Sequence, residues 1–319
     1  MSSSYALMPV KVSHIETLTP LIKRFTFCRP NGLAMPAFTG GSHILVKMND
    51  TLSNAYSLTN LPQDTQHYQI CVRKEEHSKG GSAYMHEALS IGDIVQISEP
   101  NNLFTLAQSE HKHLLIAGGI GITPFIPQLE ELHNRQAHYE LHYAFRSAEH
   151  GAFVQDLQQG THQPHCHYYS QSEGQKLDLT TLLQQQPADT HVYVCGPQSL
   201  IDNTIELCQQ FGYPDSHIHW EQFSATQPET AAAFTVTLAK SGHEITVAPN
   251  QSIIQAIETL GIEVECLCRE GVCGTCETAI VAGEAEHYDQ YLDDDEKAAQ
   301  KTMMICVSRA KGQHITLDL

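Results

Sequence analysis

The sequence predicts a multidomain fold, in which an antiparallel β-barrel is followed by an α/β domain with a parallel sheet and by a small α+β domain. Three observations support this prediction. Short apolar stretches alternate with turn residues up to residue 108, strands alternate with helices from residue 109, and five of the ten cysteines lie in the last sixty residues. A chain of 319 residues is long enough for two or three domains.

The first region, residues 1–108, contains short apolar stretches separated by turn residues: IKRFTF, GGSHILVKM, AYSLTN, YQICV and IGDIVQIS. This spacing is typical of antiparallel barrels and sandwiches. The one helix-like piece, SAYMHEAL, begins directly after Gly80 and Gly81. We therefore expect a barrel that contains a single short helix.

The second region, residues 109–223, changes to a repeated order of strand, turn and helix. The expected strands are HLLIA, YELHYAF, HCHYYS and HVYVC, and the expected helices are FIPQLEELHN, AFVQDLQQ and SLIDNTIELCQQF. Strands that alternate with helices predict a parallel sheet.

A glycine-rich turn, AGGIGITP, joins the first strand of this region to its first helix. Gly118, Gly119 and Gly121 allow a pyrophosphate to approach the backbone at the positive end of the helix. The turn lacks the full G-x-G-x-x-G pattern and the P-loop lysine, so by itself it is a weak signal. A second strand end, YVCGPQSL with Cys195 and Gly196, borders the same crevice in a doubly wound sheet. Cys195 fits a buried core thiol equally well.

The third region follows a stretch without periodicity, residues 224–233, which we expect to be a linker. Residues 234–319 begin with FTVTLA and HEITVA around Ser241-Gly242, as a hairpin does, and continue with the amphipathic helix SIIQAIETLG. They carry 14 acidic and 6 basic residues, including the run from Asp293 to Glu296. Such a run is usually a solvated helix end, and the alternative is a docking surface for a partner.

The charge balance argues against two classes of protein. With 36 acidic and 18 basic residues the formal net charge is −18, which opposes binding to nucleic acid or to an anionic membrane surface. The start, MSSSYALMPVKV, lacks the apolar core of a signal peptide, and the apolar run from Leu114 to Pro127 is too short to span a bilayer. We expect a cytoplasmic protein whose thiols stay reduced.

Four cysteines have a spacing typical of metal ligands. Cys268, Cys273 and Cys276 are arranged as C-x4-C-x2-C, and Cys306 follows within MMICVS. This is the plant-type pattern of a [2Fe–2S] cluster. A structural zinc site normally has two C-x2-C pairs, and a thioredoxin-like pair leaves Cys268 and Cys306 without a role. The cluster is the favoured interpretation.

The neighbours of these cysteines fit a cluster as well. Gly271 and Gly274 allow a tight loop, and Thr275 offers a hydroxyl donor. Cys266 lies outside the spacing and is expected to be buried and inert. The isolated cysteines are expected to be small buried side chains, and they are Cys28, Cys71, Cys166, Cys195 and Cys208. The twenty histidines are scattered and are interpreted as ordinary strand or surface residues.

Several segments, taken in order, resemble those of the phthalate dioxygenase reductase family over nearly the whole chain. These segments are NAYSLTN, VRKEEHSKGGS, AGGIGITP, CGP, HWEQF and the C-terminal cysteine pattern. The resemblance implies an FMN-binding β-barrel at 1–108, an NADH-binding α/β domain at 109–223 and a β-grasp ferredoxin domain at 234–319. It also implies that the chain is the reductase component of a two-component Rieske-type oxygenase.

The same resemblance implies where FMN binds. Tyr56 and Ser57 flank the isoalloxazine, with the Ser57 hydroxyl near N5, and Phe223 covers the ring. The phosphate is held at the start of SAYMHEAL, which suits an anion, by Gly80, Gly81 and Ser82.

One residue departs from the family's flavin motif. Asn54 stands where the family has an arginine, and an amide cannot supply the charged bidentate contact of a guanidinium. Arg73 and Lys79 are the candidates for compensating this loss. Asn54 also fits a simple turn residue.

The resemblance also implies the nicotinamide site. Thr123 and Cys195 lie near the nicotinamide, and Arg146 with Ser147 lies near the adenine ribose. The residues expected at the reacting rings are Ser57, Thr123, Cys195 and Phe223, and those expected to hold the nucleotide include Gly118, Gly119, Gly121 and Gly196.

These sites together predict a converter of electron pairs into single electrons. A nicotinamide releases two electrons as a hydride, a [2Fe–2S] cluster accepts one at a time, and a flavin handles both. We expect electrons to pass from NADH to FMN, to the cluster and to an oxygenase, which selects the final substrate. The alternatives are a non-catalytic iron–sulfur redox sensor, a FAD enzyme of the ferredoxin reductase type, and NADPH in place of NADH. Glu221 in HWEQF either tunes the flavin or has a capping or surface role.

Overall fold

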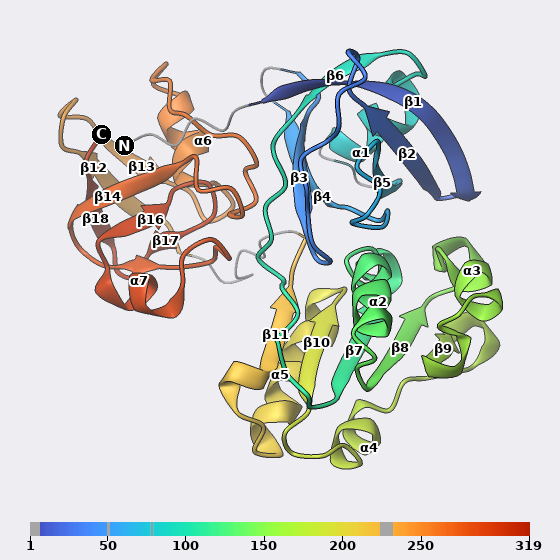
Figure 1. Cartoon of the computed structure of the whole chain (residues 1–319). Helices are drawn as coiled ribbons and strands as arrows, with labels where there is room; N and C mark the ends of the chain where they lie inside the picture. The colour runs from blue at the N-terminus through green and yellow to red at the C-terminus, as the bar shows by residue number, and fades with distance from the viewer. Residues whose placement is uncertain (1–6, 50–51, 77, 79, 224–231) are drawn as a thin grey trace. The chain divides into compact units, whose positions relative to one another are not determined.

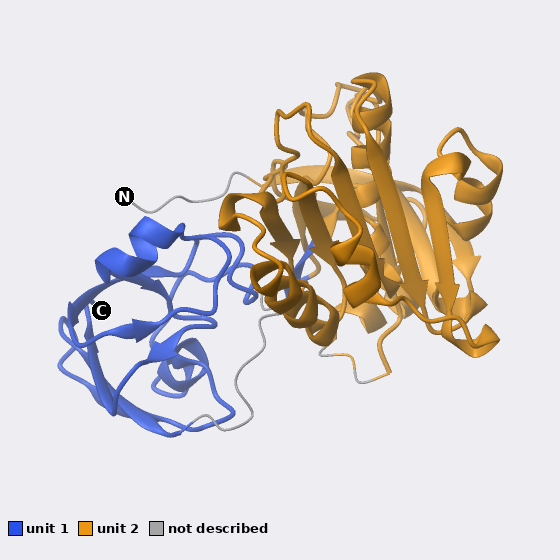
Figure 2. Cartoon of the chain, turned by 90° about the horizontal axis from the view of Figure 1, so that it is seen from below, with its two compact units in different colours: residues 1–6, 49–55, 224–319 blue, residues 7–48, 56–223 orange. Residues whose placement is uncertain are grey.

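A computed structural model describes residues 7–49, 52–76, 78, 80–223 and 232–319. The chain divides into two compact units (Figure 2). The larger unit comprises residues 7–48 and 56–223, and the smaller unit comprises the described residues of 49–55 and 224–319. Most of the expected linker at 224–233 lies outside the described residues, as does Lys79.

The N-terminal sheet is antiparallel and closes on itself. Its strand order is β4-β3-β6-β1-β2-β5 (Figure 1). The strands are β1 Met8–Thr19, β2 Ile22–Cys28, β3 His43–Lys47, β4 Ser53–Ser57, β5 Tyr68–Arg73 and β6 Ile94–Ile97. Leu58, just after β4, forms an antiparallel bridge with Ile70 of β5, so the two ends of the strand order meet. Closure of this kind defines a barrel, as predicted.

The expected helix after Gly81 is shorter and wider than an α-helix. Its first turn is α1, Gly81–Ala83, and it continues as the π-helical segment η1, Tyr84–Ala88. Gly80 precedes it with φ of 115°, a left-handed conformation that favours glycine. Single π-helical turns are found frequently at functional sites.

The second sheet of the larger unit is parallel throughout, in the order β11-β10-β7-β8-β9. Its strands are β7 His113–Gly118, β8 Tyr139–Phe145, β9 Cys166–Ser170, β10 His191–Cys195 and β11 Ile218–Glu221. The helices are α2 Phe125–Asn134, α3 Val154–Gln159, α4 Leu179–Gln184 and α5 Gln198–Gln210, and short 3-10 turns are η2 Gly119–Ile122, η3 Ala148–His150, η4 Gln163–His165, η5 Gln171–Glu173 and η6 Asp215–His217. All six residues of β7 are buried, as expected where helices cover both faces.

The barrel and the parallel sheet share one hydrophobic core. Ile22, Cys71 and Phe104 of the barrel region belong to the same buried cluster as Leu115 of β7 and Phe125 of α2. The Phe104 and Phe125 rings meet edge to face with centroids 5.6 Å apart. Because these side chains fill one interior, the two sheets cover each other's apolar surface.

The smaller unit is an α+β fold with a core of its own. Its main sheet has the order β13-β12-β18-β14-β16, and β15 pairs with β17. The elements are β12 Phe234–Leu238, β13 Glu244–Val247, α6 Ile253–Glu258, β14 Glu277–Ala282, β15 Ala285–Glu286, α7 Asp294–Ala299, β16 Thr302–Met304, β17 Arg309–Ala310 and β18 His314–Leu317. The predicted hairpin is β12–β13, and the predicted helix is α6, which begins at a capping box of Ser252 and Gln255. The predicted multidomain fold class is confirmed.

The acidic run of the smaller unit forms the first turn of a helix. Asp293 is the N-cap of α7, and its side chain accepts a hydrogen bond from Glu296 N at 2.8 Å. The Glu296 carboxylate in turn accepts one from Asp293 N at 3.0 Å. Carboxylates at this end of a helix are stabilised by its dipole. The helix-end interpretation is therefore confirmed, and the docking role stays a prediction.

The prediction that the isolated cysteines are buried is confirmed for three of the five. Cys71, Cys195 and Cys208 are buried as expected, whereas Cys28 and Cys166 are only half-buried, so the prediction is wrong for these two.

Among the described residues, no helix has the length and apolar character needed to cross a membrane.

Candidate functional site

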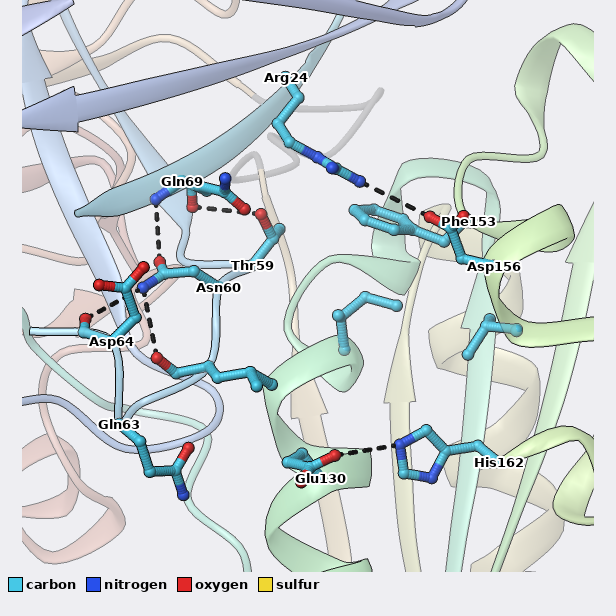
Figure 3. A pocket seen from close by; sticks show the side chains of 13 residues that line it. Arg24, Thr59, Asn60, Gln63, Asp64, Gln69, Glu130, Phe153, Asp156 and His162 are labelled. Atoms are coloured by element: carbon cyan, nitrogen blue, oxygen red, sulfur yellow. Dashed lines mark hydrogen bonds and ion pairs between the residues drawn. The ribbon is translucent and has the colours of Figure 1, made fainter. Parts of the chain in front are cut away.

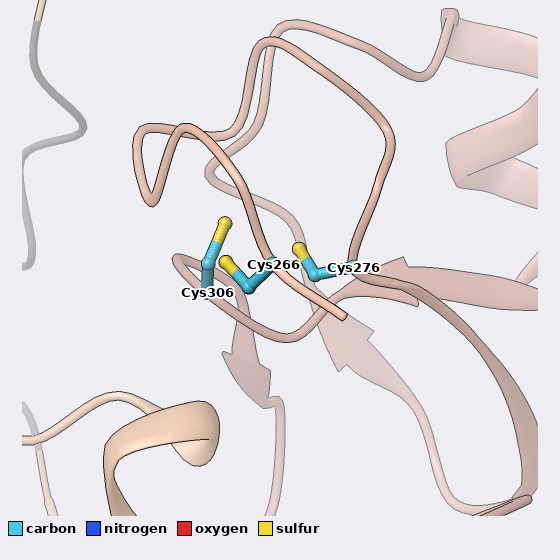
Figure 4. A group of neighbouring side chains, drawn as sticks. All are labelled: Cys266, Cys276 and Cys306. Carbon is cyan, nitrogen blue, oxygen red and sulfur yellow. The ribbon is translucent and has the colours of Figure 1, made fainter. Parts of the chain in front are cut away.

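The smaller unit gathers its cysteines in one place. The Sγ atoms of Cys266, Cys276 and Cys306 lie within 4.8 Å of one another and point toward a common space (Figure 4). The Cys268 thiol interacts with those of Cys273 and Cys306. The fold thus brings together all four predicted cluster ligands, and each of them is buried.

Cys266 differs from its expectation. It is half-buried rather than buried, and its sulfur lies with those of Cys276 and Cys306 instead of standing apart. The spacing C-x4-C-x2-C describes only positions along the chain. The fold of the loop brings the Cys266 sulfur to the space that the sulfurs of Cys276 and Cys306 also face. Its expected inertness stays a prediction.

The loop around these cysteines depends on glycines and donors. Gly271 and Gly274 have φ of 74° and 73°, and a Cβ on Gly274 would lie 2.3 Å from the Tyr291 ring. Glu270 N donates to Cys268 Sγ at 3.4 Å, and the Thr275 hydroxyl lies 3.2 Å from Cys273 Sγ. Four buried thiols with backbone and hydroxyl groups directed at their sulfurs fit a [2Fe–2S] cluster.

Asn54, the residue that departs from the family's flavin motif, belongs to the smaller unit and has a polar partner within that unit. Its Nδ2 donates to Glu270 Oε1 at 2.8 Å, and Ala55 N donates to Glu270 Oε2 at 3.2 Å. Both donors bind one carboxylate within the cysteine loop. This contact gives Asn54 a role that a turn residue does not need, and its assignment to the flavin stays a prediction.

The predicted nucleotide residues gather at the carboxyl ends of the parallel strands. The η2 turn after β7 approaches the end of β10 so closely that a Cβ on Gly121 would lie 2.3 Å from Cys195 O. Gly118 and Gly196 are packed against each other in the same way. A Cβ on Gly119, which has φ of 56°, would meet none of the described atoms within 4 Å, so that side of the turn is open. This is the edge at which ligands bind in open α/β sheets.

Replacement of Gly121 by alanine is expected to disrupt this edge. The added Cβ must displace backbone atoms of Cys195 and Gly196, and overpacking of this kind costs about 1–3 kcal/mol of stability. The KM for the nicotinamide substrate is expected to rise as the turn moves. Urea unfolding followed by the fluorescence of Trp220, together with steady-state kinetics, measures both effects.

Gly312 provides the matched control for that substitution, because a Cβ there would meet none of the described atoms within 4 Å. Gly312→Ala should leave unfolding and KM unchanged. An equal response of the two variants would contradict the role assigned to the Gly121 contact.

Two buried polar groups lie beside this edge without hydrogen-bond partners. They are Ser57 Oγ and Glu221 Oε2, which lie near each other but form no hydrogen bond with any described residue. Glu221 pairs in register with Cys195 across β10 and β11. Since buried polar atoms normally find partners, such orphaned atoms indicate a ligand that supplies them. This is the position at which a flavin and a nicotinamide are expected, so the residues fit the predicted cofactors.

Burial controls the charge of these groups. It raises the pKa of Glu221 to about 8, and the nearby Ser57 hydroxyl offsets part of that rise. Glu221 is therefore mostly neutral at pH 7. Burial also raises the pKa of the Cys195 thiol, with a further contribution from Glu221, so Cys195 is not a thiolate nucleophile.

The remaining nicotinamide residues lie at the same edge. Thr123 is buried, and its hydroxyl donates to Ile120 O at 3.0 Å. Arg146 is exposed just beyond the end of β8, and the Ser147 hydroxyl lies 3.0 Å from His150 Nδ1. The structure thus collects the predicted nicotinamide and ribose residues on the turns that follow β7, β8 and β10.

Two of the predicted FMN residues, Ser82 and Arg73, already have polar partners in the chain. Ser82 Oγ accepts a hydrogen bond from Glu75 N at 3.1 Å, and Arg73 Nη2 donates to Glu75 Oε1 at 2.6 Å. To bind a phosphate, the Arg73 guanidinium would therefore have to leave Glu75. Tyr56 lies half-buried in β4, and Phe223 is 36% exposed beyond the end of β11.

A separate cavity of about 570 Å³ lies elsewhere in the larger unit (Figure 3). The Arg24 guanidinium lies over the Phe153 ring at 5.1 Å and 3.7 Å from the Asp156 carboxylate. Glu130 and His162 line its opposite wall, 3.5 Å apart. None of the residues predicted to bind a cofactor lines this cavity.

Comparison with known proteins decides the family. Residues 236–311 match the model of the 2Fe-2S iron-sulfur cluster binding domain, and residues 98–218 match the N-terminal domain of dimethylamine monooxygenase subunit DmmA-like proteins. The chain is 60% identical, over the full length of both proteins, to the carnitine monooxygenase reductase subunit of Acinetobacter baumannii. The chain belongs to the family of the carnitine monooxygenase reductase subunits.

More distant relatives agree with this assignment. A vanillate O-demethylase oxidoreductase of Acinetobacter baylyi is 37% identical over 98% of this chain and 99% of its own. The solved structure of phthalate dioxygenase reductase, described as a modular structure for electron transfer from pyridine nucleotides to [2Fe-2S], is 31% identical, covers 98% of each chain and has a TM-score of 0.76. The predicted resemblance is confirmed. As a member of the reductase subunit family, the chain is an oxidoreductase that serves an oxygenase component.

Sequence reasoning undervalued Glu221. It left a surface role open, whereas the structure buries the residue to 7% exposure beside Cys195. The strand that carries it has no regular alternation of buried and exposed positions, so periodicity gives no signal. The position of HWEQF at the end of the nucleotide-binding sheet was the one available indication.

Proposed function

We propose that this reductase subunit takes electrons from NADH and delivers them through FMN and a [2Fe–2S] cluster to a Rieske-type oxygenase that acts on carnitine. The proposal rests above all on the joint presence of the cysteine cradle and of the nucleotide edge with its orphaned Ser57 and Glu221 atoms. The 60% identity to a carnitine monooxygenase reductase subunit supports carnitine as the substrate of the partner.

A bound flavin supplies the chemistry that exchanges a hydride for single electrons. The residues of the chain itself position the cofactors and keep water away from the reacting rings. The glycine turn admits the pyrophosphate, and the buried end of β10 excludes water from the reacting rings. A neutral Glu221 carboxyl and the Ser57 hydroxyl both offer a hydrogen to a ring atom without adding a net charge.

Anaerobic addition of NADH to the natively purified chain tests the proposal. We expect bleaching of the flavin absorbance and reduction of a one-electron acceptor, with iron, sulfide and flavin all present on analysis. The mass of the flavin released by heating distinguishes FMN from FAD, and parallel assays distinguish NADH from NADPH. A colourless sample, or a cluster that NADH does not reduce, would contradict the function and favour a redox sensor.

A second candidate partner is the oxygenase of a vanillate demethylase, since a reductase of that system is 37% identical. Reconstitution with each oxygenase, measured as oxygen uptake with carnitine or with vanillate, separates the two. Turnover with the vanillate system alone would overturn the carnitine assignment and leave the reductase function intact.

A further inference from the structure

Three side chains with metal-binding atoms meet at one edge of the parallel sheet. Glu140 and His142 lie two positions apart on β8, so both project from the same face. His167 lies on β9, the edge strand, and pairs in register with His142. One ligand atom from each of the three lies within 4.8 Å of the other two.

The geometry around His142 leaves one nitrogen for a ligand. The residue is 5% exposed, and its Nδ1 lies 2.8 Å from the Tyr169 hydroxyl. Its Nε2 has no hydrogen-bond partner among the described residues, and the nearest carboxylate oxygen, Glu140 Oε2, is 3.6 Å away. A buried imidazole nitrogen without a partner calls for an explanation, and an ion not present among the protein atoms is one of the standard ones.

The chemistry of the group suits a metal ion. A metal ion binds the neutral form of an imidazole through a nitrogen lone pair. When the Tyr169 oxygen accepts the Nδ1 hydrogen, the Nε2 lone pair is free, which is the usual arrangement for a metal-bound histidine. Lys112 Nζ binds Glu140 Oε1 at 2.9 Å and leaves Oε2 on the side of His142.

We propose that Glu140, His142 and His167 form a binding site for a divalent transition metal such as Zn²⁺. Two imidazole nitrogens and one carboxylate oxygen match the donors that zinc takes, with a fourth position left for water. His167 is exposed and gives the ion a path from solvent. A bound ion ties the edge strand β9 to β8, and it therefore stabilises the larger unit.

Zinc binding to the untagged full-length protein, with its cofactors in place, tests this site. Equilibrium dialysis at pH 7.5 followed by metal analysis should show that the wild type binds one equivalent of Zn²⁺. We expect His167→Gln to weaken the affinity for Zn²⁺ by about 100-fold or more, since loss of a residue that only supports a metal ligand costs about 10–100-fold. Zn²⁺ should also raise the unfolding temperature of the wild type and not that of this variant. The exposed position of His167 makes the substitution compatible with folding.

His165→Gln is the matched control. His165 lies two positions away, contacts the Tyr139 ring with centroids 4.4 Å apart, and is not one of the three ligands. This variant should bind Zn²⁺ as the wild type does. Any zinc held by cysteines is common to all three proteins and cancels in the comparison. Equal isotherms for wild type and His167→Gln would overturn the proposal, and equal losses in both variants would show non-specific binding to histidines and overturn it as well.

Discussion

Replacement of Cys268 by serine is expected to abolish the [2Fe–2S] cluster. The cluster requires four thiolates, and serine offers iron a poorer donor than a thiolate sulfur. Cys268 is 1% exposed, and its sulfur accepts the Glu270 N–H, which helps to hold a thiolate. We expect iron affinity to fall by at least about 100-fold, more than the loss of an outer-shell partner produces. Visible absorption and iron analysis measure the loss.

Cys266→Ser is the matched control, and it is informative because the structure places Cys266 beside Cys276 and Cys306. We expect this variant to keep its iron and its spectrum. Both variants should still show flavin bleaching by NADH, which separates a lost cluster from a misfolded chain. If Cys266→Ser loses the cluster and Cys268→Ser keeps it, the ligand set read from the spacing is wrong.

Glu221→Gln is expected to remove a pH dependence of stability in the larger unit. The pKa of Glu221 is about 8 in the folded chain and 4.5 is its ordinary value, so between these values the native state keeps a proton that the unfolded state releases. This contribution is fully present below pH 4.5 and is lost as pH rises through 8. At 1.36 kcal/mol per unit the shift amounts to about 5 kcal/mol. The glutamine variant has no such titration.

Urea unfolding of flavin-free protein between pH 5 and 8.5 measures this effect. Trp220, the only tryptophan of the chain, adjoins Glu221 and reports on the larger unit. Glu244→Gln, at an exposed position of β13, controls for the loss of a carboxylate as such. A stability difference between wild type and Glu221→Gln that stays constant across this range would contradict the shifted pKa.

Local signals made much of the fold predictable. The residues FIPQLEELHN form α2 from end to end, because helical periodicity is strong in this segment, and HVYVC forms β10, whose five residues are all buried, as is typical of a short apolar run in a parallel sheet. The cysteine spacing also led to four side chains that the fold brings together. Predictions failed where the deciding contact joins distant parts of the chain, as with Cys266.

The metal-binding side chains show why such contacts escape sequence reasoning. His142 and His167 are neighbours only because β8 and β9 pair in one particular register. The sequence of neither strand alone specifies that register, and a shift of one residue would turn the two imidazoles to opposite faces of the sheet. The same limit applies to the bridge between Leu58 and Ile70 that closes the barrel.

The common interior of the barrel and the parallel sheet limits how this reductase can evolve. Ile22, Cys71 and Phe104 fill the same space as Leu115 and Phe125, so neither half could be exchanged for a foreign module without leaving unmatched surfaces. Recombination near residue 108 would break that complementarity. The barrel and the parallel sheet, and with them flavin and nucleotide recognition, should therefore be inherited together as one structural unit.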